Sequence, residues 1–315
     1  MEFRNLHDLQ ASVLEALPCL PRDIEVVVGV PRSGMLPATL IALYLNVPLA
    51  DLDGWLDGRV LASGKRPLHS PVAHGDVRRS SRILIVDDSV GHGSQMRAVH
   101  ERVAHAQIYN RIEYAAVYVT PECSHLVDYA FEEIPWGRFF AWNIMHHTAL
   151  ENVCVDIDGV ICSDPSPDQP EGTPEYLAFL EHARPLVVPA TEIGWLVTGR
   201  LEKYRGVTEA WLRRHGVRYR SLKMLNLPDV STKRAHGGGA PFKARMYQET
   251  GATLFVESSE RESAAIAKRT GRPVLCWDSQ EMVYPEFADR LLTLPARAPR
   301  GLRNRLRRVR ARRRR

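Results

Sequence analysis

The sequence predicts an α/β protein built from two doubly wound parallel-sheet domains. Its 315 residues correspond to about two domains at the usual ~150 residues each. Short runs of β-branched and other apolar residues recur along the chain, and amphipathic stretches separate them. Continuous apolar runs of this kind are typical of parallel strands that are covered by helices on both faces. The alternation of the two patterns indicates repeated strand–helix–strand units.

The predicted elements follow from these patterns in chain order. The expected strands share a short apolar run and are residues 24–30, 82–88, 112–119, 152–158, 194–199, 252–257 and 273–277. The expected helices share an amphipathic pattern and are residues 35–45, 94–106, 204–216 and 261–271. The pattern breaks between residues 146 and 152. We therefore expect one domain at residues 1–149, a second at 150–295, and a basic tail at 296–315.

The positive charge of the chain is confined to this tail. Residues 297–315 contain eleven of the 42 lysines and arginines and no acidic residue, so 31 basic residues face 37 acidic ones elsewhere. A mildly acidic body argues against a basic groove for nucleic acid, and we expect no nucleic-acid partner. In the tail, Leu302, Leu306 and Val309 form one stripe of a short arginine-rich helix. Peripheral contact with an anionic membrane and a solvated tail both remain open.

Localisation is predicted from what the sequence does not contain. No apolar run approaches the ~20 residues that span a bilayer, and the first ten residues carry charges where a secretory signal would be apolar. We expect a cytoplasmic protein, and peripheral contact of its tail with the inner face of the membrane stays open.

A first candidate site follows two of the predicted strands, because ligands on open parallel sheets bind beyond the carboxyl ends of strands. The strand at 82–88 ends in Asp87 and Asp88, and a glycine- and serine-containing turn then opens a helix. Acids at this place can hold ribose hydroxyls, while backbone N–H groups and the helix dipole bind phosphate. The candidate binding residues here are Arg32, Ser33, Gly34, Asp87, Asp88, Ser89, Gly91, His92, Gly93, Ser94 and Gln95.

The segment RILIVDDSVGHGSQM resembles the signature of type I phosphoribosyltransferases. The resemblance implies that phosphoribosyl pyrophosphate (PRPP) binds with its ribose hydroxyls on Asp87 and Asp88 and its 5-phosphate on residues 91–95. It also implies that residues 32–34 bind the pyrophosphate, which carries Mg²⁺. Lys65 and Arg66 would belong to a mobile loop at residues 58–80 that closes over the site.

The chain departs from the phosphoribosyltransferase pattern within the phosphate loop. The usual threonines are replaced by Gly91, His92 and Gln95, so backbone donors remain but side-chain hydroxyls are lost. An ordinary strand–helix turn and a PRPP-binding protein without turnover therefore remain as alternatives.

A second candidate site follows the strand at 152–158. Asp156 and Asp158 are two residues apart and therefore point to the same side of the chain. Two such carboxylates can hold Mg²⁺ while one of them attacks phosphorus. Thr198, Lys243 and Glu257 follow at later strand ends or helix starts.

This order of acid pair, hydroxyl, lysine and acid resembles the haloacid-dehalogenase-like phosphatases over residues 152–280. The resemblance implies that Asp156 is the nucleophile and that Asp158 is the general acid and base. Thr198 and Lys243 would bind phosphoryl oxygens. Asp156, Asp158 and Glu257 are the candidate ligands of Mg²⁺. Few residues separate the first two motifs, so only a minimal cap is expected. The acid usual after Glu257 is replaced by Ser258.

The two sites in series resemble the bacterial enzymes that install ribofuranose in surface polysaccharides. The resemblance implies transfer of ribose 5-phosphate from PRPP, with inversion, to a lipid-linked glycan acceptor, followed by removal of the 5-phosphate. Capsule or O-antigen synthesis would be the setting. Two alternatives stay open: a nucleobase phosphoribosyltransferase fused to a nucleotidase, and a non-catalytic PRPP-binding regulator.

Overall fold

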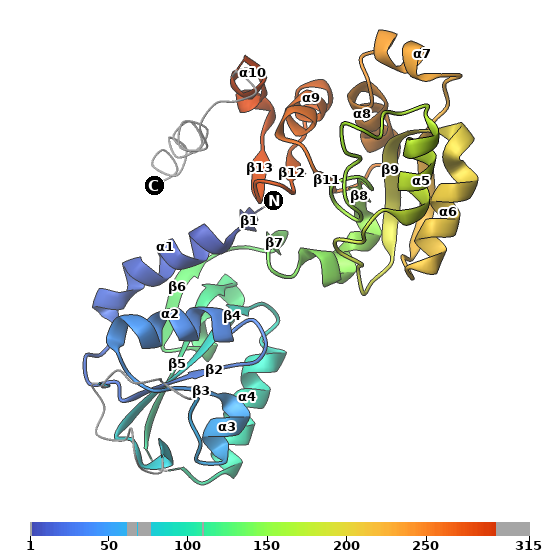
Figure 1. The fold of residues 1–315 in the computed structure, drawn as a ribbon. Helices are drawn as coiled ribbons and strands as arrows, with labels where there is room; N and C mark the ends of the chain where they lie inside the picture. Colours follow the sequence, from blue (N-terminus) through green and yellow to red (C-terminus); the bar gives the residue numbers. More distant parts are fainter. Residues whose placement is uncertain (1, 62–67, 69–76, 109, 294–315) are drawn as a thin grey trace. The chain divides into compact units, whose positions relative to one another are not determined.

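The computed structural model describes residues 2–61, 68, 77–108 and 110–293. The chain divides into two compact units, residues 1–142 and 143–315 (Figure 1). The division lies a few residues before the expected boundary at residue 149. Both units are α/β folds with parallel sheets, as the sequence predicts. Among the described residues, no helix combines the length and the apolar character needed to cross a membrane.

The first unit contains a five-stranded sheet in the order β3-β2-β4-β5-β6, in which every neighbouring pair is parallel. Its strands are β2 (Val26–Gly29), β3 (Leu49–Asp51), β4 (Arg82–Val90), β5 (Arg111–Val119) and β6 (Tyr129–Glu133). Its helices are α1 (Leu6–Ala16), α2 (Met35–Leu45), α3 (Leu52–Leu56) and α4 (Ser94–His105). A separate pair of parallel strands, β1 (Glu2–Arg4) and β7 (Arg138–Phe140), joins the two ends of this unit.

Helices cover both faces of this sheet because successive strand residues point to opposite sides. On one face, Val27 and Leu84 pack with residues of α1 and α2. On the other face, Val28 and Ile85 pack with residues of α3 and α4. Burial on both faces explains why these strands are continuous apolar runs.

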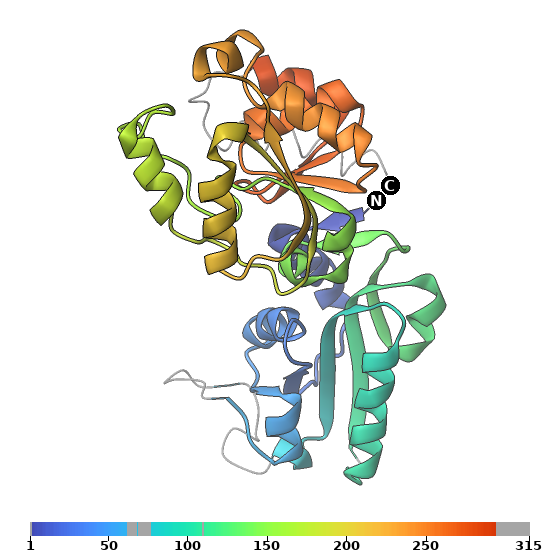
Figure 2. The ribbon, with the colours of Figure 1, turned by 90° about the vertical axis from the view of Figure 1, so that its right-hand side faces the viewer.

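The second unit contains a six-stranded sheet in the order β10-β9-β8-β11-β12-β13, parallel except for β13. Its strands are β8 (Val153–Val155), β9 (Ile193–Leu201), β10 (Tyr219–Leu225), β11 (Leu254–Glu257), β12 (Val274–Cys276) and β13 (Glu281–Val283). Its helices are α5 (Pro174–His182), α6 (Arg205–Arg214), α7 (Val230–Ala235), α8 (Ala240–Glu249), α9 (Glu260–Thr270) and α10 (Pro285–Thr293). Figure 2 shows α5 and α6 on one side of this sheet and α8 and α9 on the other.

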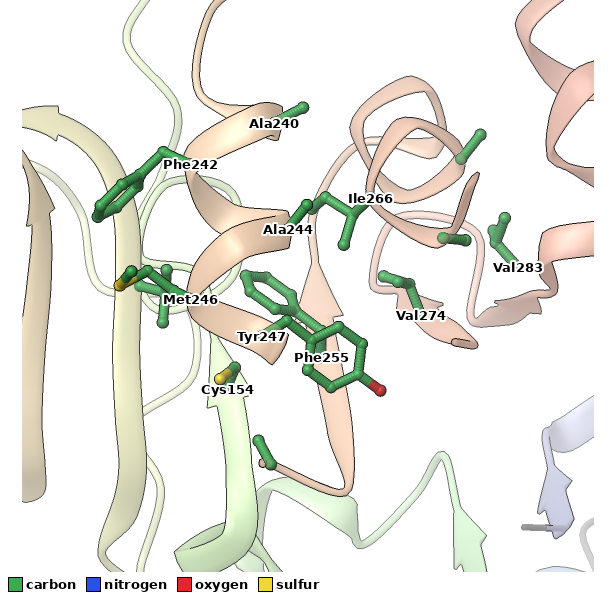
Figure 3. Close-up of a cluster of buried hydrophobic side chains, with 14 of the residues drawn as sticks. Cys154, Ala240, Phe242, Ala244, Met246, Tyr247, Phe255, Ile266, Val274 and Val283 are labelled. Carbon is green, nitrogen blue, oxygen red and sulfur yellow. The ribbon is translucent and has the colours of Figure 1, made fainter. Parts of the chain in front are cut away.

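The core of the second unit fixes α8 against the sheet. Tyr247 of α8 lies edge-on to Phe255 of β11, with ring centroids 5.6 Å apart (Figure 3). Both rings belong to a buried cluster that also contains Cys154 of β8 and Val197 of β9. Lys243 is one helical turn before Tyr247 on α8, so this packing also determines where Lys243 lies.

The structure confirms the seven expected strands and four expected helices, with shifts of a few residues at their ends. The sequence missed several strands that lie at sheet edges, including β6 and β10. These edge strands are partly exposed and contain charged residues, so they lack an unbroken apolar run. Periodicity therefore identified the central strands better than the edge strands.

Candidate functional site

The acid pair at the end of β4 is held by side chains from two other segments. Asp87 and Asp88 are both buried, at 6% and 4% exposure. The Ser33 hydroxyl donates to Oδ1 of Asp88 at 2.8 Å, and the Trp142 indole N–H donates to Oδ2 at 2.7 Å. Each carboxylate oxygen of Asp88 therefore has its own donor. Burial and the charge of Asp88 raise the pKa of Asp87 well above its usual value.

The pyrophosphate-loop candidates meet this acid pair. Gly34 is buried, and a Cβ there would lie 2.9 Å from Oδ1 of Asp87 and 2.8 Å from the Val86 carbonyl oxygen. Only glycine fits at this close approach. Arg32 is exposed, whereas Ser33 is half-buried and bonds Asp88. Lys65 and Arg66 lie outside the described residues.

The phosphate-loop candidates lie between the end of β4 and the start of α4. Gly93 occupies the N-cap position of α4 with φ of +77°, a conformation that favours glycine, and it caps the helix without a side-chain hydrogen bond. The first N–H groups of α4 are therefore available to an anion. The Thr120 hydroxyl donates to the Gly91 carbonyl oxygen at 2.9 Å and anchors the other end of the loop.

A cationic and aromatic group packs against the same loop. The rings of His92 and Trp136 lie 4.2 Å apart, and the Arg138 guanidinium lies 5.5 Å from the centre of the Trp136 ring. A Cβ at Gly91 would lie 3.0 Å from both Arg138 Nη2 and Trp136. Sequence reasoning assigned no function to Trp136 or Arg138.

The second candidate site centres on Lys243. Its ammonium donates at 2.7 Å to each of three carboxylates, those of Asp156, Glu257 and Glu262. Lys243, Asp156 and Glu257 are nearly inaccessible to solvent. The structure thus brings together three residues that lie 87 and 14 positions apart in sequence. Glu262 is a partner that sequence reasoning missed.

The charges around Lys243 are unbalanced, with three acids on one ammonium. Burial, then the charge of Glu257, raise the pKa of Asp156 well above its usual value despite the opposing effect of Lys243. Burial likewise raises the pKa of Glu257. Burial lowers the pKa of Lys243, but the three carboxylates outweigh this effect and the net shift is upward.

Asp158 has a different partner from Asp156. Arg200 binds it with two N–H groups, Nε to Oδ2 at 3.1 Å and Nη2 to Oδ1 at 2.6 Å. Burial alone would raise the pKa of Asp158, but the Arg200 ion pair lowers it overall. The Thr198 hydroxyl accepts a hydrogen bond from the Arg200 backbone N–H at 3.2 Å, so Thr198 lies close to the Arg200–Asp158 pair.

A further carboxylate, Asp164, lies beside this cluster. Its Oδ2 would be 2.7 Å from a Cβ at Gly159, a residue with φ of +73°. Burial, followed by the charges of Asp158 and neighbouring acids, raises the pKa of Asp164 to about 6. Across the described ranges, no group of three or more His, Cys, Asp and Glu side chains has the geometry of a metal site.

Comparisons with known proteins assign the first unit. The family described as "Phosphoribosyl transferase domain" matches residues 4–141. A xanthine-guanine phosphoribosyltransferase of Chromohalobacter salexigens is 32% identical over 121 residues, which are 38% of this chain and 68% of that protein. The chain belongs to the phosphoribosyltransferase family. It has phosphoribosyltransferase activity, and the match contains the acid pair and the loop that follows it.

Solved phosphoribosyltransferase structures are similar to the same part of the chain. The purine phosphoribosyltransferase of Pyrococcus horikoshii is 22% identical, covers 45% of this chain and 92% of its own, and gives a TM-score of 0.33. The xanthine-guanine-hypoxanthine phosphoribosyltransferase of Helicobacter pylori is 15% identical with the same coverage and a TM-score of 0.35.

Trp142 connects the acid pair to the core of the phosphoribosyltransferase unit. It packs against that core but is half-buried, and its indole N–H donates to Asp88. Its ring stacks on Phe140, with centroids 4.9 Å apart. A tryptophan in an apolar stretch resembles a core residue in sequence, so only the position of Asp88 identifies this contact.

Proposed function

We propose that this phosphoribosyltransferase transfers ribose 5-phosphate from PRPP to a glycan acceptor and that its second unit then hydrolyses the 5-phosphate. The product would be a β-ribofuranosyl residue, formed with inversion, in a bacterial surface polysaccharide. The observation that carries the proposal is the buried group of Asp156, Lys243 and Glu257 in the same chain as a phosphoribosyltransferase unit. Such a group suits removal of the phosphate that the first reaction leaves on its product.

In the first unit, Ser33 and Trp142 donate hydrogen bonds to Asp88 and orient its carboxylate. This carboxylate would bind the ribose hydroxyls. The 5-phosphate would bind the N–H groups of residues 91–95 at the start of α4. Residues 32–34 would bind the pyrophosphate, where Mg²⁺ would neutralise developing charge. Bond breaking at C1 would release pyrophosphate, and the acceptor hydroxyl would form the new glycosidic bond and lose its proton.

In the second unit, the proposal assigns haloacid-dehalogenase-like chemistry to residues already in contact. Asp156 would attack phosphorus, and an aspartyl-phosphate would form as the bond from phosphorus to the sugar oxygen breaks. Asp158 would give a proton to that oxygen and then take one from the attacking water. Arg200 binds both oxygens of Asp158 and lowers its pKa, so Asp158 would donate a proton only after one of these oxygens is released toward the leaving group while the other stays on Arg200. Lys243 and Thr198 would bind the phosphoryl oxygens.

The donor set around Asp156 suits a divalent cation. Three carboxylates share the single charge of Lys243, so a second cation would relieve the excess negative charge. Mg²⁺ needs only one or two carboxylates together with water and substrate oxygens, rather than a full protein cage. Asp156 and Glu257 would hold it, with Asp158 as the third candidate. When bound, it would stabilise negative charge on the transferred phosphoryl group.

Two classes of acceptor, a glycan and a nucleobase, are compatible with transfer from PRPP. Running both reactions on a nucleobase would discard the phosphate that makes a salvaged nucleotide useful, which favours a glycan. The relationship to a xanthine-guanine phosphoribosyltransferase favours the second candidate, a nucleobase transferase fused to a nucleotidase. With a lipid-linked glycan, the arginine-rich tail at 296–315, outside the described residues, would contact the anionic membrane surface.

The test is to incubate the full chain with PRPP, Mg²⁺ and either a glycan or a nucleobase, and to measure pyrophosphate, phosphate and product mass. We expect glycan-dependent release of both ions. Base-dependent release would establish the second candidate instead. Binding of PRPP without either release would indicate a regulator.

The Asp156→Asn variant separates the two steps. We expect it to release pyrophosphate at the wild-type rate and to accumulate a phosphoribosylated product about 80 Da heavier than the final one, since one HPO₃ group is retained. Replacing Asp87 and Asp88 with Asn should abolish pyrophosphate release while phosphatase activity on ribose 5-phosphate esters persists. Continued phosphate release by Asp156→Asn would refute the assignment of the nucleophile.

A further inference from the structure

Arg138 presents an unused hydrogen-bonding group beside the phosphate loop. Its Nη1 atom is buried and has no hydrogen-bond partner in the structure. An N–H group that is buried without an acceptor is costly, and such groups are rare in folded proteins. The guanidinium is held in position by the rings of Trp136 and Phe140, at 5.5 and 5.7 Å. A held but unsatisfied donor suggests an acceptor that arrives with a ligand.

The ligand is indicated by what lies next to the guanidinium. Arg138 Nη2 would be 3.0 Å from a Cβ at Gly91, the first residue of the phosphate loop. Asp88 is close enough for its charge to act on Arg138, although burial dominates and lowers the pKa of the guanidinium. Arg138 therefore lies beside the loop and within electrostatic range of Asp88, in a part of the unit where an anion is expected.

The neighbours of Gly91 leave no room for a larger side chain at position 91. The φ of Gly91 is outside the left-handed region, so its backbone would accept any residue. Space is the constraint, because the side chain of a residue at 91 would meet Arg138 and Trp136 at 3.0 Å. A threonine at position 91 would offer a hydroxyl beside the phosphate loop. In this chain the Arg138 guanidinium lies next to that position instead.

We infer that Arg138 is a further phosphate-binding residue, whose unpaired N–H groups bind the 5-phosphate of the phosphoribosyl donor in place of a loop hydroxyl. The inference rests on the proposed function through its assignment of residues 91–95 to the 5-phosphate. A guanidinium suits this task because its planar donors match two phosphate oxygens at once. The rings of Trp136 and Phe140 hold it in position, so little side-chain freedom is lost on binding.

The test is calorimetric titration of the full chain with PRPP, ribose 5-phosphate and pyrophosphate, each with Mg²⁺. Loss of a charged hydrogen bond predicts that Arg138→Met weakens binding of PRPP and ribose 5-phosphate roughly tenfold to a hundredfold. Binding of pyrophosphate, which lacks the 5-phosphate, should stay within about twofold. Arg138→Lys keeps the charge without the planar fork and should fall between the two. Arg102→Met, an exposed arginine on α4 that pairs with Asp53, is the matched control and should bind all three like wild type.

A pair of variants tests the exchange between positions 91 and 138. Gly91→Thr alone should weaken binding of ribose 5-phosphate, because the new side chain collides with Arg138. When Arg138 and Trp136 are both replaced by Ala, the two collisions are removed, and the same change should restore about tenfold of the lost affinity through the threonine hydroxyl.

The outcomes separate the inference from the function on which it rests. Unchanged ribose 5-phosphate affinity in Arg138→Met, with wild type binding normally, would overturn the inference alone. Equal losses of affinity for pyrophosphate and for ribose 5-phosphate in Arg138→Met would also overturn the inference, because they would indicate that Arg138 has a structural role. Failure of the wild-type protein to bind PRPP and ribose 5-phosphate would overturn both the loop assignment and the inference.

Discussion

Trp142→Phe is the sharpest test of how the phosphoribosyltransferase site is assembled. The change removes one indole N–H, which donates to Asp88 Oδ2 at 2.7 Å, and keeps an aromatic ring to stack on Phe140. Asp88 would keep the hydrogen bond from the Ser33 hydroxyl on its other oxygen, Oδ1. The carboxylate would then be free to turn about the remaining hydrogen bond.

The expected magnitude follows from this geometry. A hydrogen bond to a charged group contributes about 1.5–3 kcal/mol. If that orientation is needed to bind ribose hydroxyls, PRPP affinity should fall roughly tenfold to 150-fold, at about 1.4 kcal/mol per factor of ten. Because Asp88 is buried, the folded unit should also lose about 1–3 kcal/mol of stability.

The assay is calorimetric binding of PRPP with Mg²⁺, together with thermal unfolding to measure the stability loss. Trp195→Phe is the matched control, because Trp195 packs against the core of the second unit and should leave PRPP binding unchanged. PRPP affinity within twofold of wild type in Trp142→Phe would refute the reasoning, since the indole contact would then contribute nothing to the site.

Two further predictions concern the second unit. Arg200→Met leaves Asp158 without its bidentate partner, so we expect phosphatase activity to fall at least 100-fold and unfolding free energy to fall by about 3–5 kcal/mol, measured by phosphate release and urea denaturation; near-normal activity would show that Arg200 is not needed to position Asp158. For Asp164, the folded-state pKa of about 6 lies above the ordinary value of 3.8, so the folded form binds more protons and stability falls as the pH rises from about 4 to 6. Because this carboxylate is exposed, we expect Asp164→Asn to gain only about 1 kcal/mol at pH 7 and nothing near pH 3, as urea unfolding at both pH values would show. An equal gain at both pH values would contradict the charge explanation.

The sequence alone determined the architecture and the edges of the sheets where the candidate sites lie. Parallel strands that are buried on both faces must be apolar along their whole length, so β4 and β8 are visible as uninterrupted runs. Acids directly after such runs necessarily lie at the carboxyl edge of a sheet. This reasoning placed Asp156 directly after β8, as the structure has it, whereas Asp87 and Asp88 lie inside β4, a few residues before its end at Val90.

Only the tertiary structure decided which side chains meet. Arg138 and Trp142 lie about fifty residues after the acid pair, and nothing in their local pattern distinguishes a site residue from a packing residue. Likewise, Arg200 and Glu262 gained their roles from the packing of β9 and α9 beside Asp158 and Lys243. Local periodicity indicates whether a segment is buried. A hydrogen bond between distant segments also depends on the direction of each side chain, and tertiary packing determines that direction. The sequence therefore predicted the candidate residues, and the fold determined the partners that orient their charges.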